Sequence, residues 1–231
     1  MIAALAGALL LALLPVPTLD GPVVDRAGVL SQPERARLDA LARAAHDAGG
    51  QGKGPQLAFL IVPSLEGEPI ETYSIRVAEK WKLGARDRDD GLLFIVSIED
   101  RVARIEVGGG LEGDLTDVQA GRIVREIMAP AFGQGGFGAG LRAGAEASLN
   151  ALGVDVGQPK APRQDEAPIH PLLLLAVVAI LFFGARALGI PIRLGGTGSF
   201  GGSGGGRRGG GGGGYRGGGG GFSGGGASGR W

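Results

Sequence analysis

Apolar residues recur at three- and four-residue spacing in four stretches of the chain, and this period predicts amphipathic helices. Two of the stretches begin with the spacing of a capping box, Ser31 with Glu34 and Thr116 with Gln119. The third of them ends at Pro130, because proline does not continue a helix. The predicted helices cover residues 31–49, 73–84, 116–130 and 137–149.

Three shorter runs have the pattern of strands. Residues 56–62 and 92–98 are almost continuously apolar, which is typical of strands buried on both faces. Residues 101–107, "RVARIEV", alternate between polar and apolar, which predicts a strand with one face in water. Helices alternating with apolar strands predict an α/β fold. We expect a three-layer helix/sheet/helix sandwich, with a small, mostly parallel sheet and an antiparallel hairpin.

The first 14 residues, "MIAALAGALLLALL", are apolar but too short to span a bilayer comfortably. They predict a signal peptide over residues 1–19, cleaved in about 15–20, with an uncleaved N-terminal anchor as the alternative. No Lys or Arg precedes the run, and no A-x-A site follows it. The globular pattern covers residues 23–150, and the Pro-, Ala- and charge-rich residues 151–170 are typical of a linker.

A longer apolar run predicts a transmembrane helix at residues 171–192, where 172–183 are uninterrupted. A buried core helix is the alternative, and it lacks a following folded sequence to cover it. Arginines after the run favour a cytoplasmic C-terminal side. We therefore expect a single-pass protein of the cell membrane, in contact with the lipid bilayer, whose globular domain is extracytoplasmic. Residues 193–231, rich in glycine, are expected to form a disordered cytoplasmic tail.

Charge and composition exclude several classes of function. Lys+Arg and Asp+Glu balance at 23 each, so the whole chain has no electrostatic preference for nucleic acid. No nucleic-acid partner is expected, although "RRGG" in the tail leaves RNA binding as a minor alternative. The absence of cysteine excludes thiolate catalysis, and two histidines leave little for a histidine metal site or a Ser-His-Asp triad.

Four motifs in order give the chain a family likeness. They are "VVDRAGVLS" at 23–31, "WKLG" at 81–84, "DDGLLFIV" at 89–96 and "RIEVGGGLEGDLTD" at 104–117. Together they resemble the TPM domain family over residues 23–150. The flanking signal sequence, membrane span and glycine-rich tail ending in "GGGASGRW" also resemble bacterial members of that family.

The resemblance implies an α/β sandwich and an extracytoplasmic domain, but it does not imply one activity. Among relatives, acid phosphatase activity is attributed to chloroplast members that serve photosystem II repair. An animal member modulates a receptor as a membrane partner, and some bacterial domains of this type bind calcium.

Acidic residues are expected to converge at one end of the hairpin. If Ile98 pairs with Arg101, then Leu93 faces Glu106, and the two glycine-containing loops meet. Carboxylates from several loops suit a hard cation such as calcium. The family motif adds a loop aspartate before the first helix. The predicted ligands of calcium or another divalent cation are Asp25, Asp89, Asp90, Glu112 and Asp117.

The same acids have simpler interpretations. Asp89 and Asp90 before Gly91 are also typical of a turn, and Asp117 is favoured by the dipole of a first helical turn. Glu112, in a loop with Gly110 before it and Gly113 after it, has no evident structural role. A phosphatase here would need an aspartate nucleophile or metal-activated water, and no catalytic residue can be assigned.

The sequence therefore predicts a membrane-anchored, cation-binding accessory or regulatory module. Its partner would be an unidentified membrane or envelope protein, and no organic cofactor is expected. Whether the chain is an enzyme stays open. A weak metal-dependent acid phosphatase is the alternative function.

Overall fold

The computed structural model describes residues 13–48, 50, 52–156, 215–222 and 224–231, which belong to one compact unit. The strands are β1 (Val23–Asp25), β2 (Gln56–Val62), β3 (Gly91–Ser97), β4 (Val102–Val107) and β5 (Gly225–Arg230). The helices are α1 (Gln32–Ala48), α2 (Ile70–Trp81), α3 (Asp117–Arg122), the π-helix η1 (Ile123–Met128), α4 (Ala129–Gly133) and α5 (Phe137–Ala151).

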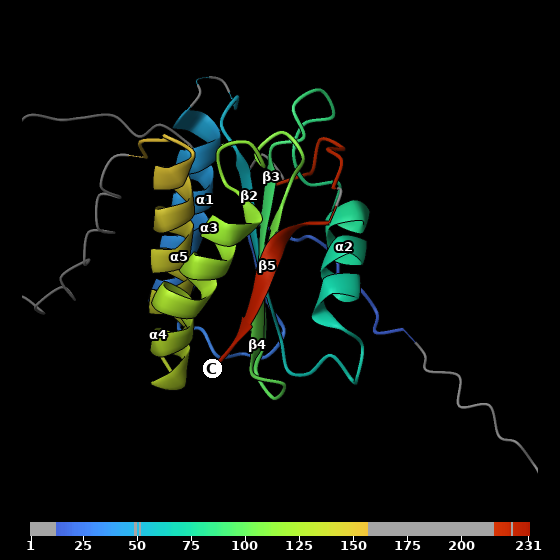
Figure 1. The fold of residues 1–231 in the computed structure, drawn as a ribbon, viewed down its shortest axis with the longest axis vertical. Coiled ribbons are helices and arrows are strands. Elements are labelled where there is room, and N and C mark those ends of the chain that lie inside the picture. The colour runs from blue at the N-terminus through green and yellow to red at the C-terminus, as the bar shows by residue number, and fades with distance from the viewer. Residues whose placement is uncertain (1–12, 49, 51, 157–214, 223) are drawn as a thin grey trace, which may run out of the picture. The chain divides into compact units, whose positions relative to one another are not determined.

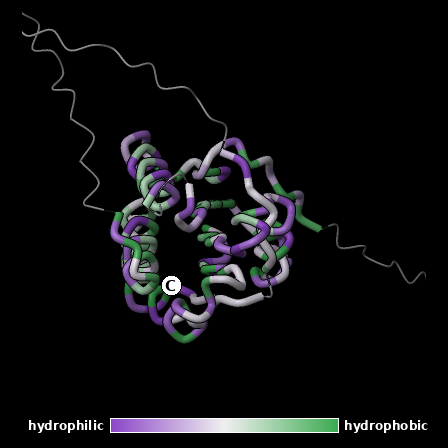
Figure 2. The backbone as a smooth tube through the Cα atoms, turned by 90° about the horizontal axis from the view of Figure 1, so that it is seen from above, coloured by the Kyte–Doolittle hydropathy of each residue, from purple (hydrophilic) through white to green (hydrophobic). Residues whose placement is uncertain are grey.

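The strands form one mixed sheet in the order β1-β2-β3-β4-β5. β1, β2 and β3 are parallel, and β3–β4 and β4–β5 are antiparallel. α2 covers one face of the sheet, and α1, α3, η1, α4 and α5 cover the other (Figure 1). In the view from above, hydrophobic segments lie in the middle, between helices on either side (Figure 2). The α/β fold and its helical layers are confirmed, and the sheet is mixed, with two parallel and two antiparallel pairings.

Most local predictions hold. β2 and β3 are buried along their whole length, as their continuous apolar sequences predict. Leu93 faces Glu106 across the β3–β4 pair, which is the predicted hairpin register. Thr116 forms the complete capping box with Gln119, in which each side chain accepts from the other residue's backbone N–H.

The helix expected to end at Pro130 continues past it. α3, η1 and α4 follow one another without a break, and Pro130 lies in the first turn of α4. The N–H of Ala129 donates to the carbonyl of Val124, five residues earlier, as in a π-helix. Pro130 thus lies where the five-residue spacing of the π-helix gives way to α4.

β4 does not have the predicted wet face. Arg104 and Glu106 are buried under α2, with relative exposures of 5% and 0%. Arg104 Nε lies 2.5 Å from Glu106 Oε2, and the Ser74 hydroxyl donates to the same oxygen at 2.7 Å. The alternating pattern is therefore that of an internal ion pair, because a buried charge is tolerated when it is paired.

The C-terminal end of the chain also differs from the expectation. Residues 225–230, expected to be disordered, form β5 at the edge of the sheet. Among residues 13–156 and 215–231, no helix has the length and apolar character needed to cross a bilayer. The predicted signal segment up to residue 12, the span at 171–192 and most of the linker lie outside the described residues.

Candidate functional site

The five predicted cation ligands lie at two ends of the sheet. Asp25 ends β1, whereas Asp89 and Asp90 precede β3, and β1 and β3 both run parallel to β2. Asp25 is consequently at the opposite end from the others. Its side chain is fully buried and accepts from the N–H groups of Ala27, Gly28 and Leu30 at 2.7–3.1 Å. Asp25 thus stabilises the loop that follows β1 by accepting hydrogen bonds from its backbone.

Asp90 stabilises the turn before β3. Its Oδ1 accepts from the N–H of Ala85 at 2.7 Å, and its Oδ2 lies 2.7 Å from Arg88 Nε. Asp89 has a left-handed backbone conformation, φ 46°, which aspartate tolerates better than most residues. Its Oδ1 accepts from the N–H of Gly221 at 2.5 Å. Asp89 therefore binds a segment 132 residues further along the chain.

Glu112 and Asp117 face the same C-terminal segment. Asp117 Oδ1 accepts from the N–H of Gly226 at 2.6 Å. Glu112 lies so close to Gly225 that a Cβ at Gly225 would overlap its carboxylate. Within residues 13–156 and 215–231, no three Asp, Glu or His side chains are grouped to hold a metal ion. Three of the acids at this loop end, Asp89, Glu112 and Asp117, lie against a polypeptide backbone, and Asp89 and Asp117 accept hydrogen bonds from its N–H groups.

The segment begins its contacts before β5. Tyr215 donates from its hydroxyl to the carbonyl of Leu57, and Arg43 lies over its ring at 5.8 Å from the ring centre. Burial raises the pKa of Tyr215, so this hydroxyl stays a donor. The N–H groups of Gly218 and Gly220 both donate to the carbonyl of Gly84, at 3.0 and 3.1 Å. Residues 215–220 therefore follow the loop after α2.

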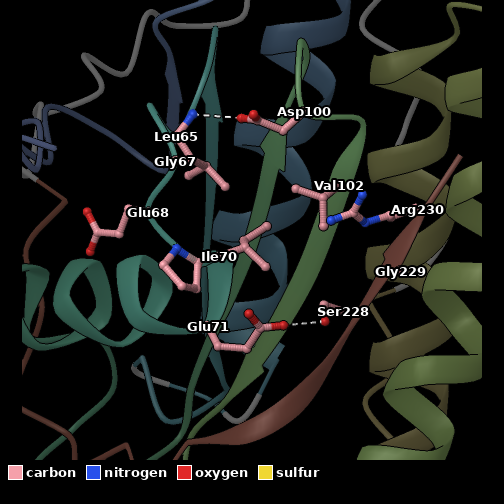
Figure 3. A pocket seen from close by; sticks show the side chains of 11 residues that line it. Leu65, Gly67, Glu68, Ile70, Glu71, Asp100, Val102, Ser228, Gly229 and Arg230 are labelled. Atoms are coloured by element: carbon pink, nitrogen blue, oxygen red, sulfur yellow. Dashed lines mark hydrogen bonds between the residues drawn. The ribbon is translucent and has the colours of Figure 1, made fainter. Parts of the chain in front are cut away.

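β5 then pairs with β4 over six residues, from Val102 opposite Arg230 to Val107 opposite Gly225. On the α2 face, Ser228 donates to Glu71 at 2.6 Å (Figure 3). On the other face, the ring of Trp231 lies edge-on to Phe132 and Phe137, with centroids 5.0 and 6.1 Å apart. The strand is thus fixed by its backbone ladder, by hydrogen bonds to Glu71 and Asp117, and by the aromatic contacts of Trp231 at its end. We call residues 215–231 the C-terminal segment and its binding surface on β4 and the loops the edge site.

Two glycines in β5 are required by their positions. Gly226 has φ +121°, a conformation that residues with a Cβ rarely adopt. A Cβ at Gly229 would lie 2.8 Å from the Val124 side chain of η1. The glycine-rich sequence here fits a narrow space under the helical layer. Sequence reasoning missed this role, although Ala227, Ser228 and Trp231 interrupt the glycines and were a usable signal.

A cavity of about 570 Å³ lies between β5 and the start of α2 (Figure 3). The Ser228 hydroxyl holds the pKa of Glu71 below its ordinary value. The Ser97 hydroxyl does the same for the pKa of Asp100, and the N–H of Leu65 adds to it. Both acids are thereby favoured in their charged form. Because β5 supplies part of the lining, this cavity exists only with the C-terminal segment in place.

A second segment of the chain, residues 14–17, lies along α2. Side chains of α2 donate to four successive backbone carbonyls, those of residues 14–17. The donors are Tyr73, Arg76, Lys80 and Trp81. Burial raises the pKa of Tyr73 to about 12, which keeps its hydroxyl protonated. The part of the predicted signal peptide that the structure describes is therefore bound to the domain.

The geometry defines a small α/β domain that binds two segments of its own chain. The TPM domain family model matches residues 23–151, more than half of the chain, and the chain belongs to that family. The structure is similar to the solution NMR structure of the N-terminal domain of a protein from P. gingivalis. That likeness has 29% identity and a TM-score of 0.52, and covers 59% of this chain and 88% of that one.

A second similar structure is the N-terminal domain of the cg2496 protein from Corynebacterium glutamicum, also determined by solution NMR. It has 15% identity and a TM-score of 0.46, over 63% of this chain and 89% of that one. No curated protein matches the chain.

Proposed function

We propose that this TPM-domain chain is a non-enzymatic accessory or regulatory module for membrane and envelope proteins, and that it works by binding extended polypeptide at the edge site. The observation that carries the proposal is the pairing of β4 with a strand far away in sequence. The guanidinium of Arg104 donates a hydrogen bond to the carbonyl of Gly224 at 3.1 Å, and the two residues are 120 positions apart in the chain. Addition of a strand to a sheet edge is a common mode of peptide recognition.

The loop acids support this proposal because they accept from backbone N–H groups of the bound segment. Asp89 and Asp117 each accept one such hydrogen bond, from Gly221 and Gly226. A hydrogen bond to a charged acceptor contributes about 1.5–3 kcal/mol, more than a neutral one. Recognition of backbone groups by fixed carboxylates suits a module whose ligand is a strand.

Peptide titration tests the proposal. The receptor is the full chain carrying Gly226→Val, which prevents its own segment from docking because valine does not adopt the positive φ of that position. A labelled peptide of residues 215–231 is expected to bind it saturably, one per chain. The same peptide with Ala227→Pro is the control, since proline removes a ladder N–H and should not bind.

Absence of saturable binding to the folded receptor contradicts the proposal. A wild-type full chain titrated with excess peptide provides the second measurement, in which the added peptide must displace the resident segment. If the Gly226→Val chain does not fold, this displacement alone decides.

Cation binding and metal-dependent phosphatase activity stay separate predictions. A divalent cation at Asp89 and Asp117 would have to compete with the N–H groups of Gly221 and Gly226. Calcium should therefore weaken peptide binding if it uses these acids. Hydrolysis of a phosphomonoester by the full chain, lost in Asp90→Asn, would favour the enzyme.

A further inference from the structure

We infer that the edge site also takes the C-terminal segment of a second copy of this chain, so that β4 of one copy pairs with β5 of another. The inference rests on the proposed function, because it names the partner of the same site. It is carried by three features of the molecule: the sequence-specific fit of the segment, the length of the connection before it, and the charged underside of β4.

The fit restricts the ligand to a particular sequence. Gly226 supplies a positive φ, and Gly229 leaves room for Val124. Ser228 supplies the hydroxyl for Glu71, and Trp231 fills the space beside two phenylalanine rings. A second copy carries an end that satisfies every one of these positions, which a random extended peptide does not.

The connection to the segment is long enough to reach a neighbour. Roughly 60 residues lie between the end of the described domain at Val156 and Tyr215, and fully extended they would cover about 200 Å. The effective concentration of a tethered strand falls as about the −3/2 power of the connection length. A long connection therefore lowers the advantage of the chain's own strand, and it is long enough for that strand to reach the edge site of a neighbouring copy.

An empty edge site stays compatible with water, which exchange requires. β4 carries Arg104 and Glu106, and charged residues on an edge strand oppose uncontrolled association. Their ion pair, with Ser74, belongs to β4 and α2 alone. Among the hydrogen bonds of this ion pair, departure of the segment removes the one from Arg104 to the carbonyl of Gly224 and leaves the bonds between Arg104, Glu106 and Ser74 in place.

Disulfide trapping tests exchange, because the natural chain contains no cysteine. Val102 lies opposite Arg230, and the bond from the N–H of Trp231 to the carbonyl of Arg101 makes the 102–230 pair a non-hydrogen-bonded one. The Cα atoms of such a pair are about 4.5 Å apart, within the range of a disulfide. Full chains carrying Val102→Cys are mixed with full chains carrying Arg230→Cys and oxidised.

We expect a disulfide that joins the two chains, at a yield about tenfold above a control in which the second chain carries Ser228→Cys. That control is two residues off register, where diagonal positions are about 7–8 Å apart. Adding Gly229→Val to the Arg230→Cys chain should remove the product, because valine meets Val124.

Two further results separate the inference from the proposed function. The first uses one chain that carries both Val102→Cys and Arg230→Cys. If its disulfide forms only within one chain, and the mixture of single variants gives no more product than the control, exchange is overturned and strand binding is left intact. Failure of both bonds, with chains that are folded by circular dichroism, overturns the proposed function as well.

Discussion

Removal of the last aromatic ring should release the C-terminal segment from the sheet. Trp231→Ala in the full chain deletes both edge-on contacts, those with Phe132 and Phe137. The β5 backbone and its hydrogen bonds are unchanged by this substitution. The variant therefore measures how much the aromatic end contributes to docking.

The expected loss follows from the two ring contacts. Each aromatic pair contributes about 0.5–1.5 kcal/mol beyond its buried area, so the two together contribute about 1–3 kcal/mol. Since 1.4 kcal/mol is tenfold in an equilibrium constant, the opening constant of the segment should rise roughly 5- to 150-fold. Burial of the indole surface adds to this value.

Amide hydrogen exchange on β4 provides an assay with an internal reference. The N–H of Trp231 donates to Arg101 and that of Gly108 to Gly91, which fixes the alternation along the strand. Amides of β4 that face β5 are those of Ala103, Ile105 and Val107, and those that face β3 are those of Val102, Arg104 and Glu106. In Trp231→Ala the first set should exchange roughly 5- to 150-fold faster, and the second set should not change.

Equal changes in both sets of amides would mean that the variant destabilises the whole domain, and no change in either would mean that the ring contacts do not hold the segment. Both results refute the reasoning. Arg230→Ala is the matched control, because the Arg230 side chain, next to Trp231 in the chain, is exposed, and its removal leaves the aromatic rings in contact.

Three further predictions concern charged groups. The hydrogen bond from Ser228 lowers the pKa of Glu71 from 4.5, so docking of the C-terminal segment should be favoured above pH 4.5 and should weaken as the pH falls below it. The NMR signal of the Trp231 indole measures this loss of docking, and Ser228→Ala should remove its pH dependence. Glu106→Gln leaves Arg104 buried without its counter-charge and should lower the free energy of unfolding by about 3–5 kcal/mol in urea, more than the paired apolar replacement of both residues does. Asp90→Asn should lower the same free energy by about 1–3 kcal/mol with or without calcium, and a loss confined to the calcium-loaded chain would instead indicate a metal ligand.

The sequence predicts the domain well where one period dominates. The buried strands β2 and β3, the capping box at Thr116 and the hairpin register all follow from local patterns, and the structure confirms them. Each depends on residues close in the chain, or on the alternation that a pleated strand imposes.

The candidate site was less predictable because its partners are distant in sequence. The polar positions of β4 show that one face of the strand is polar, but the pattern is the same whether that face contacts water or holds a buried ion pair such as Arg104–Glu106. The five acids were expected to share a cation, but Asp25 lies at the other end of the sheet, and Asp89 and Asp117 accept from the C-terminal segment. The roles of Asp89 and Asp117 become visible only when the C-terminal segment is placed beside them.

Composition misled most strongly at the C-terminus. A glycine-rich segment has too few apolar groups to fold alone, and this predicts disorder. In the structure, the missing side chains let the strand lie close under η1, where Gly229 approaches Val124. Here glycine meets a packing requirement that the surrounding domain imposes.

Pairing of β5 with β4 also constrains the predicted membrane arrangement. A single crossing at 171–192 would put residues 23–150 and 193–231 on opposite sides of the membrane. The β4–β5 pair needs the domain and the C-terminal segment on the same side of the membrane. A chain that crosses the membrane once at 171–192 therefore cannot also form this strand pair within itself. In whole cells, a cysteine placed at Arg230 should react with a membrane-impermeant reagent only if the segment is outside, together with the domain.

The most direct test of the account is nuclear Overhauser spectroscopy on the full chain. Ser228 and Arg104 are opposite each other in a non-hydrogen-bonded pair of the β4–β5 ladder, in which Cα atoms are about 4.5 Å apart. The account predicts a strong Hα–Hα cross-peak between these two residues, with contacts from the Trp231 indole to the ring of Phe132. Absence of both, with random-coil shifts for residues 215–231 beside a folded domain, would contradict it.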